Sequence, residues 1–119
     1  MAIHFITKDA KSLLEAFDAR IAQSEAKGKI TTWEKSDDGK YYTHKASEWN
    51  KEAWLRPKIE ASQLTFNIIK PKGKDVTTIA YAYYHGHLIE TFLNHFDNSF
   101  QNGVASALPE AGDLINSQS

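Results

Sequence analysis

The stretch QLTFNIIKPKGKDVTTIAYAYY, residues 63–84, contributes most to the fold expected from this sequence. Residues 63–70 alternate, with Leu64, Phe66 and Ile68 on one side and polar residues between them, as in a strand with one buried face. Residues 71–74 read Pro-Lys-Gly-Lys, which is typical of a loop. Residues 76–84 alternate again, so the stretch predicts a β-hairpin whose second strand places small alanines against a closely packed helix.

A second hairpin is predicted directly upstream of this one. Residues 30–36 and 41–47 are rich in Thr, Tyr and Trp, which suit a pleated surface. Asp-Asp-Gly-Lys at 37–40 contains the Asp-Gly pair that favours a hairpin turn. If Ser36 faces Tyr41, Trp33 lies opposite His44. Residues 47–55 fit a short helical turn or an irregular loop equally well, and residues 59–61 suit a short edge strand.

Amphipathic helices are predicted on both sides of the hairpins. Residues 8–27 repeat apolar side chains at steps of three and four, with Thr7 as N-cap and Gly28 as the residue that ends the helix. Residues 87–100 carry a similar stripe and end before Asn102-Gly103. Each helix needs an apolar surface to cover, which the sheet provides.

These elements predict an α+β fold of order α-β-β-β-β-α. We expect a two-layer sandwich in which a four-stranded, mainly antiparallel sheet carries both helices on one face. Residues 1–100 would form a single domain. Residues 101–119 are rich in Gly, Ser, Ala, Gln and Asn, so we expect an irregular tail that is partly disordered. The sheet face without helices would expose aromatic and polar side chains.

Composition excludes several classes of protein. The 119 residues include 14 Lys and Arg against 15 Asp and Glu, so the chain is not a strongly basic nucleic-acid binder. The absence of Cys removes disulfides, thiol nucleophiles and thiolate metal sites. No apolar run reaches the roughly 18 residues of a membrane helix, and the N-terminus lacks a signal-peptide pattern. We therefore expect a soluble, cytoplasmic protein.

Protein recognition is the leading functional hypothesis. Tyr and Trp are enriched in interface cores, so we expect a protein-binding or self-associating module without catalysis or cofactor. Its partner would be another protein or a second copy of the chain. The expected contact residues are Trp33, Tyr42, Trp49 and Trp54, although Trp49 and Trp54 could instead bury their rings within the molecule. Residues 76–119 contain four acidic residues and no Lys or Arg, and this asymmetry also suits self-association.

A nucleic-acid-binding module is the first alternative. Sheet tyrosines can stack on bases while lysines attract phosphates. The residues that suit this role are Lys70, Lys72, Lys74, Tyr81 and Tyr83. The lack of cations after residue 75 weighs against it, because phosphate contacts supply most non-specific affinity.

A small histidine-based or metal-dependent enzyme is the second alternative. On a strand, His85 and His87 would share one face, and Glu90 is the nearest candidate for a third ligand. Local hydrogen bonding explains the same residues without a metal. The sequence contains no Gly-x-Ser-x-Gly and no phosphate-binding glycine loop, so catalysis is not favoured.

Overall fold

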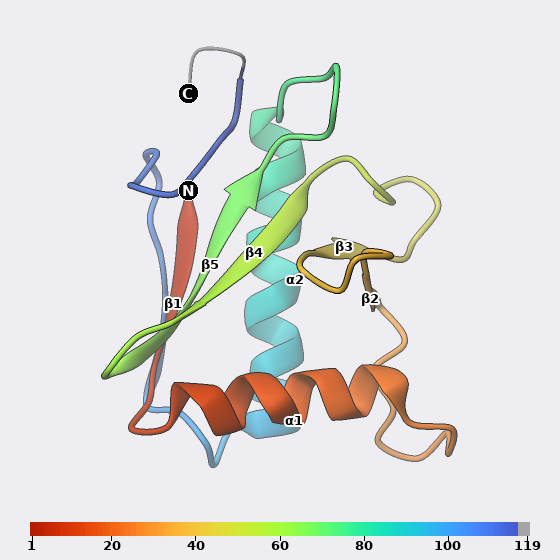
Figure 1. Ribbon diagram of the computed structural model, residues 1–119, viewed down its shortest axis with the longest axis vertical. Helices are drawn as coiled ribbons and strands as arrows, with labels where there is room; N and C mark the ends of the chain where they lie inside the picture. Colours follow the sequence, from red (N-terminus) through yellow and green to blue (C-terminus); the bar gives the residue numbers. More distant parts are fainter. Residues whose placement is uncertain (117–119) are drawn as a thin grey trace.

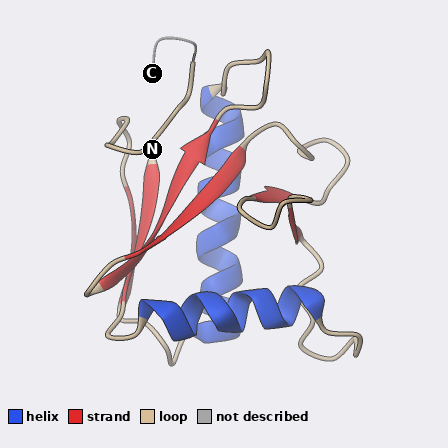
Figure 2. Ribbon diagram, viewed as in Figure 1, coloured by secondary structure: helices blue, strands red, loops and turns tan. Residues whose placement is uncertain are grey.

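A computed structural model describes residues 1–116 of the chain as two helices and one six-stranded sheet (Figures 1 and 2). In chain order the elements are β1 (Ala2–Ile6), α1 (Ala10–Ala22), β2 (Trp33–Lys35), β3 (Tyr42–His44), β4 (Trp54–Ile59), β5 (Gln63–Ile69), α2 (Thr78–Phe96) and β6 (Asn102–Ala105). The strands lie in the order β2-β3-β4-β5-β1-β6, and each neighbouring pair is antiparallel.

The predicted α+β class is confirmed, but the predicted number of strands is wrong. Three of the predicted strands are present as β2, β3 and β5, and β1, β4 and β6 complete the sheet of six. Both ends of the described chain join the sheet, since β1 pairs with β5 on one side and with β6 on the other. Residues 102–105 therefore form a strand where we expected an irregular tail. Residues 117–119, the end of that predicted tail, lie outside the described residues.

The largest difference concerns residues 76–84, which begin a helix instead of completing a hairpin. Thr77 caps α2, and its side chain accepts a hydrogen bond from the Ala80 backbone N–H at 3.1 Å. The buried side chains on α2 include Ala80, Tyr84, Leu88 and Phe92, each four residues after the last. This stripe continues without interruption through the segment that was predicted to be a second, separate helix.

The remaining elements differ from the prediction mainly at their ends. The predicted pairing of Trp33 with His44 is confirmed. The first helix begins at Ala10, with Asp9 as its N-cap, and ends at Ala22. The edge strand predicted at 59–61 is wrong: β4 covers Trp54–Ile59 and lies inside the sheet between β3 and β5.

The hydrophobic core lies between one face of the sheet and the two helices. Phe17 of α1 and Phe92 of α2 both contact Phe66 of β5, with ring centroids 6.0 and 5.7 Å apart. The Phe92 ring also stacks on Phe5 of β1 at 4.1 Å. Burial of each of these rings contributes about 1.5–3 kcal/mol, so both helices are fixed to the same face of the sheet. In Figure 1, α1 runs across one end of the strands and α2 runs along them.

Candidate functional site

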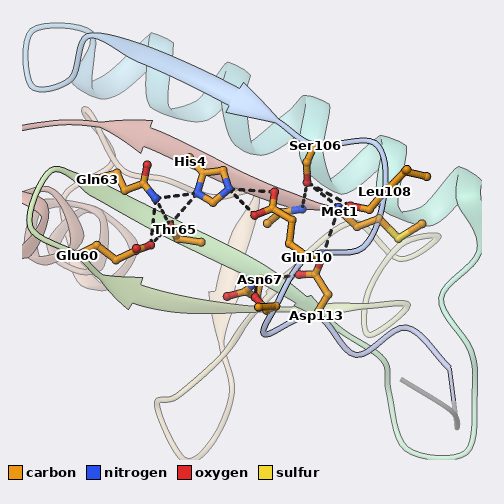
Figure 3. Close-up of polar contacts among 12 residues, drawn as sticks. Met1, His4, Glu60, Gln63, Thr65, Asn67, Ser106, Leu108, Glu110 and Asp113 are labelled. Atoms are coloured by element: carbon orange, nitrogen blue, oxygen red, sulfur yellow. Dashed lines mark hydrogen bonds and ion pairs between the residues drawn. The ribbon is translucent and has the colours of Figure 1, made fainter.

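The outer face of β1 and β5, opposite the helices, carries a polar network centred on His4 (Figure 3). His4 Nδ1 lies 2.8 Å from Thr65 Oγ1, and His4 Nε2 lies 2.9 and 3.0 Å from the two carboxylate oxygens of Glu110. The Thr65 hydroxyl donates to Glu60, and Gln63 Nε2 donates to the same carboxylate at 3.2 Å. The network therefore joins β1 and β5 to the segment that follows β6.

The carboxylates of this network are held in their charged form. Hydrogen bonds from Thr65 and then Gln63 lower the pKa of Glu60. Hydrogen bonds from Ser106 and then His4 lower the pKa of Glu110. Because the Thr65 hydroxyl proton goes to Glu60, its oxygen is left to accept from His4 Nδ1. Which nitrogen of the His4 ring donates, Nδ1 to Thr65 or Nε2 to Glu110, depends on the tautomer of the imidazole.

A second anchor on the outer face is the carboxylate of Asp113, whose side chain is fully buried. It accepts hydrogen bonds from Asn67 Nδ2 at 2.8 Å, from the Glu110 backbone N–H at 2.8 Å and from the Ile68 N–H at 3.2 Å. The Met1 ammonium lies 3.4 Å away. These four groups compensate the buried charge, which would otherwise be costly.

Gly112 allows the chain to reach this anchor. Its φ is +97°, and a Cβ there would lie 2.8 Å from the side-chain oxygen of Asn67, so both conformation and space favour glycine. Arg56 also donates to the Gly112 carbonyl at 2.6 Å. Residues 106–115, called the tail segment below, are thereby fixed to the sheet, and Leu114 near their end forms a parallel backbone bridge with Ile69 of β5.

The His4 network is suited to holding the chain in place and not to nucleophilic catalysis. A carboxylate, an imidazole and a hydroxyl follow one another in Glu110, His4 and Thr65, as in a catalytic triad. However, Thr65 is only 3% exposed and its hydroxyl proton is committed to Glu60. A substrate therefore has no access to the hydroxyl that would have to attack it.

Strand β6, which the tail segment follows directly, forms one border of the sheet (Figure 2). The Ser106 N–H donates to the Ala2 carbonyl at 2.9 Å, and the register pairs Val104 with His4. Because backbone groups alternate in direction along an antiparallel strand, Val104 points its N–H and C=O toward β1, and Gly103 and Ala105 point theirs outward. Within residues 1–116 no strand lies beyond β6, and all four of its residues are exposed.

Strand β2 forms the opposite border and is built differently. The Trp33 ring is 1% exposed, and its Nε1–H donates to Thr91 Oγ1 on α2 at 2.9 Å. Asn50 Nδ2 donates to the Glu34 carboxylate at 2.8 Å, and Lys35 is exposed. Two of the three residues of β2 are therefore charged, and the third is part of the core.

The predicted contact residues Trp33 and Tyr42 lie in the core, so the expectation that they anchor a partner at the surface is wrong. Tyr42 is 1% exposed, contacts Phe17 of α1 and donates its hydroxyl to Asp18. Burial and then this carboxylate raise the pKa of the Tyr42 hydroxyl. The aromatic face of the first hairpin is the face that the helices cover, and the open face of the sheet is polar.

The other two predicted contact residues, Trp49 and Trp54, are half-buried at separate places. Trp49 stacks on Tyr83 at 4.2 Å, and Tyr83 stacks on His87 at 4.0 Å. Trp54 contacts the ring of Tyr41, with centroids 6.5 Å apart. Both tryptophans thus have ring partners within the molecule, and their role toward a partner stays a prediction.

The structure does not form the predicted nucleic-acid platform on the sheet. Tyr81 and Tyr83 lie on helix α2, so they do not present a row of rings along a strand. Lys74 forms an ion pair with Glu52, and Lys70 Nζ donates to the Pro71 carbonyl at 3.4 Å. Lys72 is exposed.

The structure also separates the predicted metal ligands His85, His87 and Glu90. On a helix, residues two apart point about 200° apart, so His85 and His87 cannot share a face as they would on a strand. His85 is 4% exposed in the interior, and burial lowers its pKa, whereas His87 stacks on Tyr83. Glu90 is exposed. Within residues 1–116, no three His, Asp or Glu side chains lie close enough together to hold one metal ion.

A groove of about 930 Å³ lies between residues 28–32 and α2, with Glu90 and His95 among its lining residues. Its buried polar side chain, Thr91, already accepts from Trp33 and donates to the His87 carbonyl at 2.8 Å. The groove therefore offers no unpartnered buried group that would select a ligand.

Comparison with known proteins adds no relative: no family model, no curated protein and no solved structure matches the chain. Neither helix found in residues 1–116 is long and apolar enough to cross a membrane.

Proposed function

We propose that the protein is a protein-binding module that accepts an extended segment of its partner along the outer edge of β6. The observation that supports this proposal is the outward direction of the Gly103 and Ala105 backbone groups on an exposed border strand. Addition of a strand to an open sheet edge is a recurrent mode of peptide recognition, in which main-chain hydrogen bonds supply affinity.

The sequence around β6 supports an edge kept open for binding. Proteins usually protect edge strands with charges, proline or a bulge, because an open edge invites pairing with other chains. Residues 101–109 read QNGVASALP, in which no residue is charged and the proline is the last residue. The side chain of Val104 is 50% exposed. An unprotected edge of this kind is either an aggregation hazard or a recognition surface.

The anchoring of β6 on its inner side, and of the segment that follows it, also favours recognition. β6 is paired along its inner side with β1, and the tail segment after it is fixed by Glu110 and Asp113. The edge is therefore held in an extended form before a partner arrives. Such preorganisation lowers the entropic cost of binding.

Titration of the ¹⁵N-labelled full chain with two synthetic peptides tests the proposal. One peptide copies residues 100–108, and the other alternates valine and threonine between terminal lysines. We expect the amide signals of Gly103 and Ala105 to shift most. An Ala105→Pro variant has no N–H at position 105 and should lose the peptide-induced shift at Gly103, whereas the matched Ala105→Gly variant should show shifts at both positions. If neither peptide perturbs these amides, the proposal is wrong.

A further inference from the structure

We infer that the partner segment is β6 of a second copy of this chain, paired antiparallel about a twofold axis that passes between the two Val104 residues. This inference rests on the function proposed above and names its partner. It specifies the register, the residue beside the axis and the side chains that meet.

The backbone of β6 is self-complementary in this register. The outward N–H and C=O groups belong to Gly103 and Ala105, which lie symmetrically about Val104. In an antiparallel pair centred on Val104, Gly103 faces the partner subunit's Ala105, and Ala105 faces the partner subunit's Gly103. Each of these residues then exchanges both of its backbone hydrogen bonds.

The side chain of Val104 suits the axis of such a dimer. The two valines would form a non-hydrogen-bonded pair, the kind in which facing Cα atoms approach to about 4.5 Å. Val104 is 50% exposed and lies on the outer face, as does its β1 partner His4. Contact between the two valines would remove apolar surface that each monomer leaves in water.

The inner side of the edge provides an apolar floor. A Cβ placed on Gly103 would lie 3.2 Å from the Phe5 ring and 3.9 Å from Ile89 of α2. The small residues Gly103 and Ala105 therefore leave the edge strand lying directly on core side chains. A second β6 placed alongside would continue this arrangement across the axis.

Charge favours a second copy over a charged partner segment. Residues 101–109 are all uncharged, so two copies bring no like charges together along the paired strands. A basic or acidic segment would find no opposite charge on the strand to compensate its desolvation. Because β6 has only four residues, the contact is small, and we expect a dimer that dissociates on dilution.

Sedimentation equilibrium of the full chain over a wide concentration range tests the inference. We expect the mass to rise from 13.4 kDa toward twice that value as concentration increases. The Val104→Lys variant should weaken dimerisation at least about tenfold, since it places two ammonium groups together on the axis. Ile59→Lys is the matched control: Ile59 is 52% exposed on β4 of the same sheet, and its variant should dimerise as the unmodified chain does.

The outcomes distinguish this inference from the proposed function. A chain that stays monomeric, yet shows peptide-induced shifts at Gly103 and Ala105, overturns the second-copy inference and leaves the strand-accepting function intact. A monomer that also fails to bind the peptides overturns both. A dimer that is unaffected by Val104→Lys, with circular dichroism showing a folded variant, also overturns the inference, because the contact would then lie elsewhere.

Discussion

The two border strands of the sheet, β2 and β6, are held in place by different kinds of contact. In β2, Trp33 is inserted between the sheet and α2, and the charged side chains of Glu34 and Lys35 occupy the remaining positions. In β6, no side chain is buried and none is charged. The strand is instead held by its pairing with β1 and by the tail segment, which Glu110 and Asp113 fix to the outer face.

We infer from this difference that β2 mainly stabilises the fold, whereas β6 is available for recognition. A border strand anchored through a buried tryptophan contributes to the core and is protected from pairing by its charges. A border strand anchored through polar contacts of the following segment contributes little apolar burial, but it keeps its outward backbone groups accessible. The following changes test this division, from the largest expected effect to the smallest.

Truncation of Trp33 should have the largest effect on stability. Trp33→Ala removes a fully buried ring and leaves Thr91 without its indole donor, which should lower the free energy of unfolding by about 3–5 kcal/mol. Urea denaturation measures the change. The matched truncation on the other border, Val104→Ala, should cost less than about 0.5 kcal/mol. Equal losses at the two positions would contradict the division.

Removal of the Asp113 carboxylate should have an intermediate effect. Asp113→Ala leaves the Asn67 amide and the N–H groups of Ile68 and Glu110 without their acceptor, at a cost of about 1–3 kcal/mol. Asp113→Asn retains one oxygen acceptor and should cost less. Exposed Glu25 provides the control, since Glu25→Ala should leave the urea midpoint almost unchanged. A fully stable Asp113→Ala variant would show that the tail segment is not anchored there.

Acid should weaken the attachment of the tail segment before it disrupts the core. The pKa values of Glu60 and Glu110 lie below their ordinary value of 4.5, so these groups stabilise the folded state above that pH. This contribution is lost as the pH falls through the lowered pKa values. The stability difference between the unmodified chain and Glu110→Gln, measured by urea denaturation, should therefore shrink on acidification. A difference that grows as the pH falls would contradict this assignment.

The smallest change in stability is expected at the proposed interface. Val104→Lys exchanges one exposed side chain for another, so the free energy of unfolding of the dilute monomer should change by less than about 0.5 kcal/mol. A large loss of monomer stability, measured by urea denaturation at low concentration, would mean that Val104 supports the fold and is not free for recognition.

Local sequence signals predicted part of this fold. The apolar stripe of residues 10–21 and the Asp-Gly turn at 38–39 are short-range features, and they located α1 and the pairing of Trp33 with His44. Residues 76–84 were ambiguous because positions four apart, such as Ala80 and Tyr84, share a face on a strand and on a helix. The stripe beyond Gly86 decides for a helix, since it continues in steps of four through Leu88 and Phe92.

The candidate site was beyond the reach of local patterns. His4 and Glu110 are 106 positions apart, and β1 and β6 become neighbours only when the two ends of the described chain meet. The sequence does contain one signal: residues 2–6 read Ala-Ile-His-Phe-Ile, a short apolar run that suits a strand and contains His4 as its single polar residue. The face of the first hairpin was also misassigned, because the correct register does not state which side the helices cover.

Amide hydrogen exchange at β6, followed by NMR as a function of protein concentration, tests the central claim most directly. The Val104 N–H, which points toward β1, should be protected at every concentration. The N–H groups of Gly103 and Ala105 should exchange rapidly in dilute solution and become protected as concentration rises. Protection of Gly103 and Ala105 in the dilute monomer would contradict an open edge, and rapid exchange at the highest concentration would contradict pairing with a second copy.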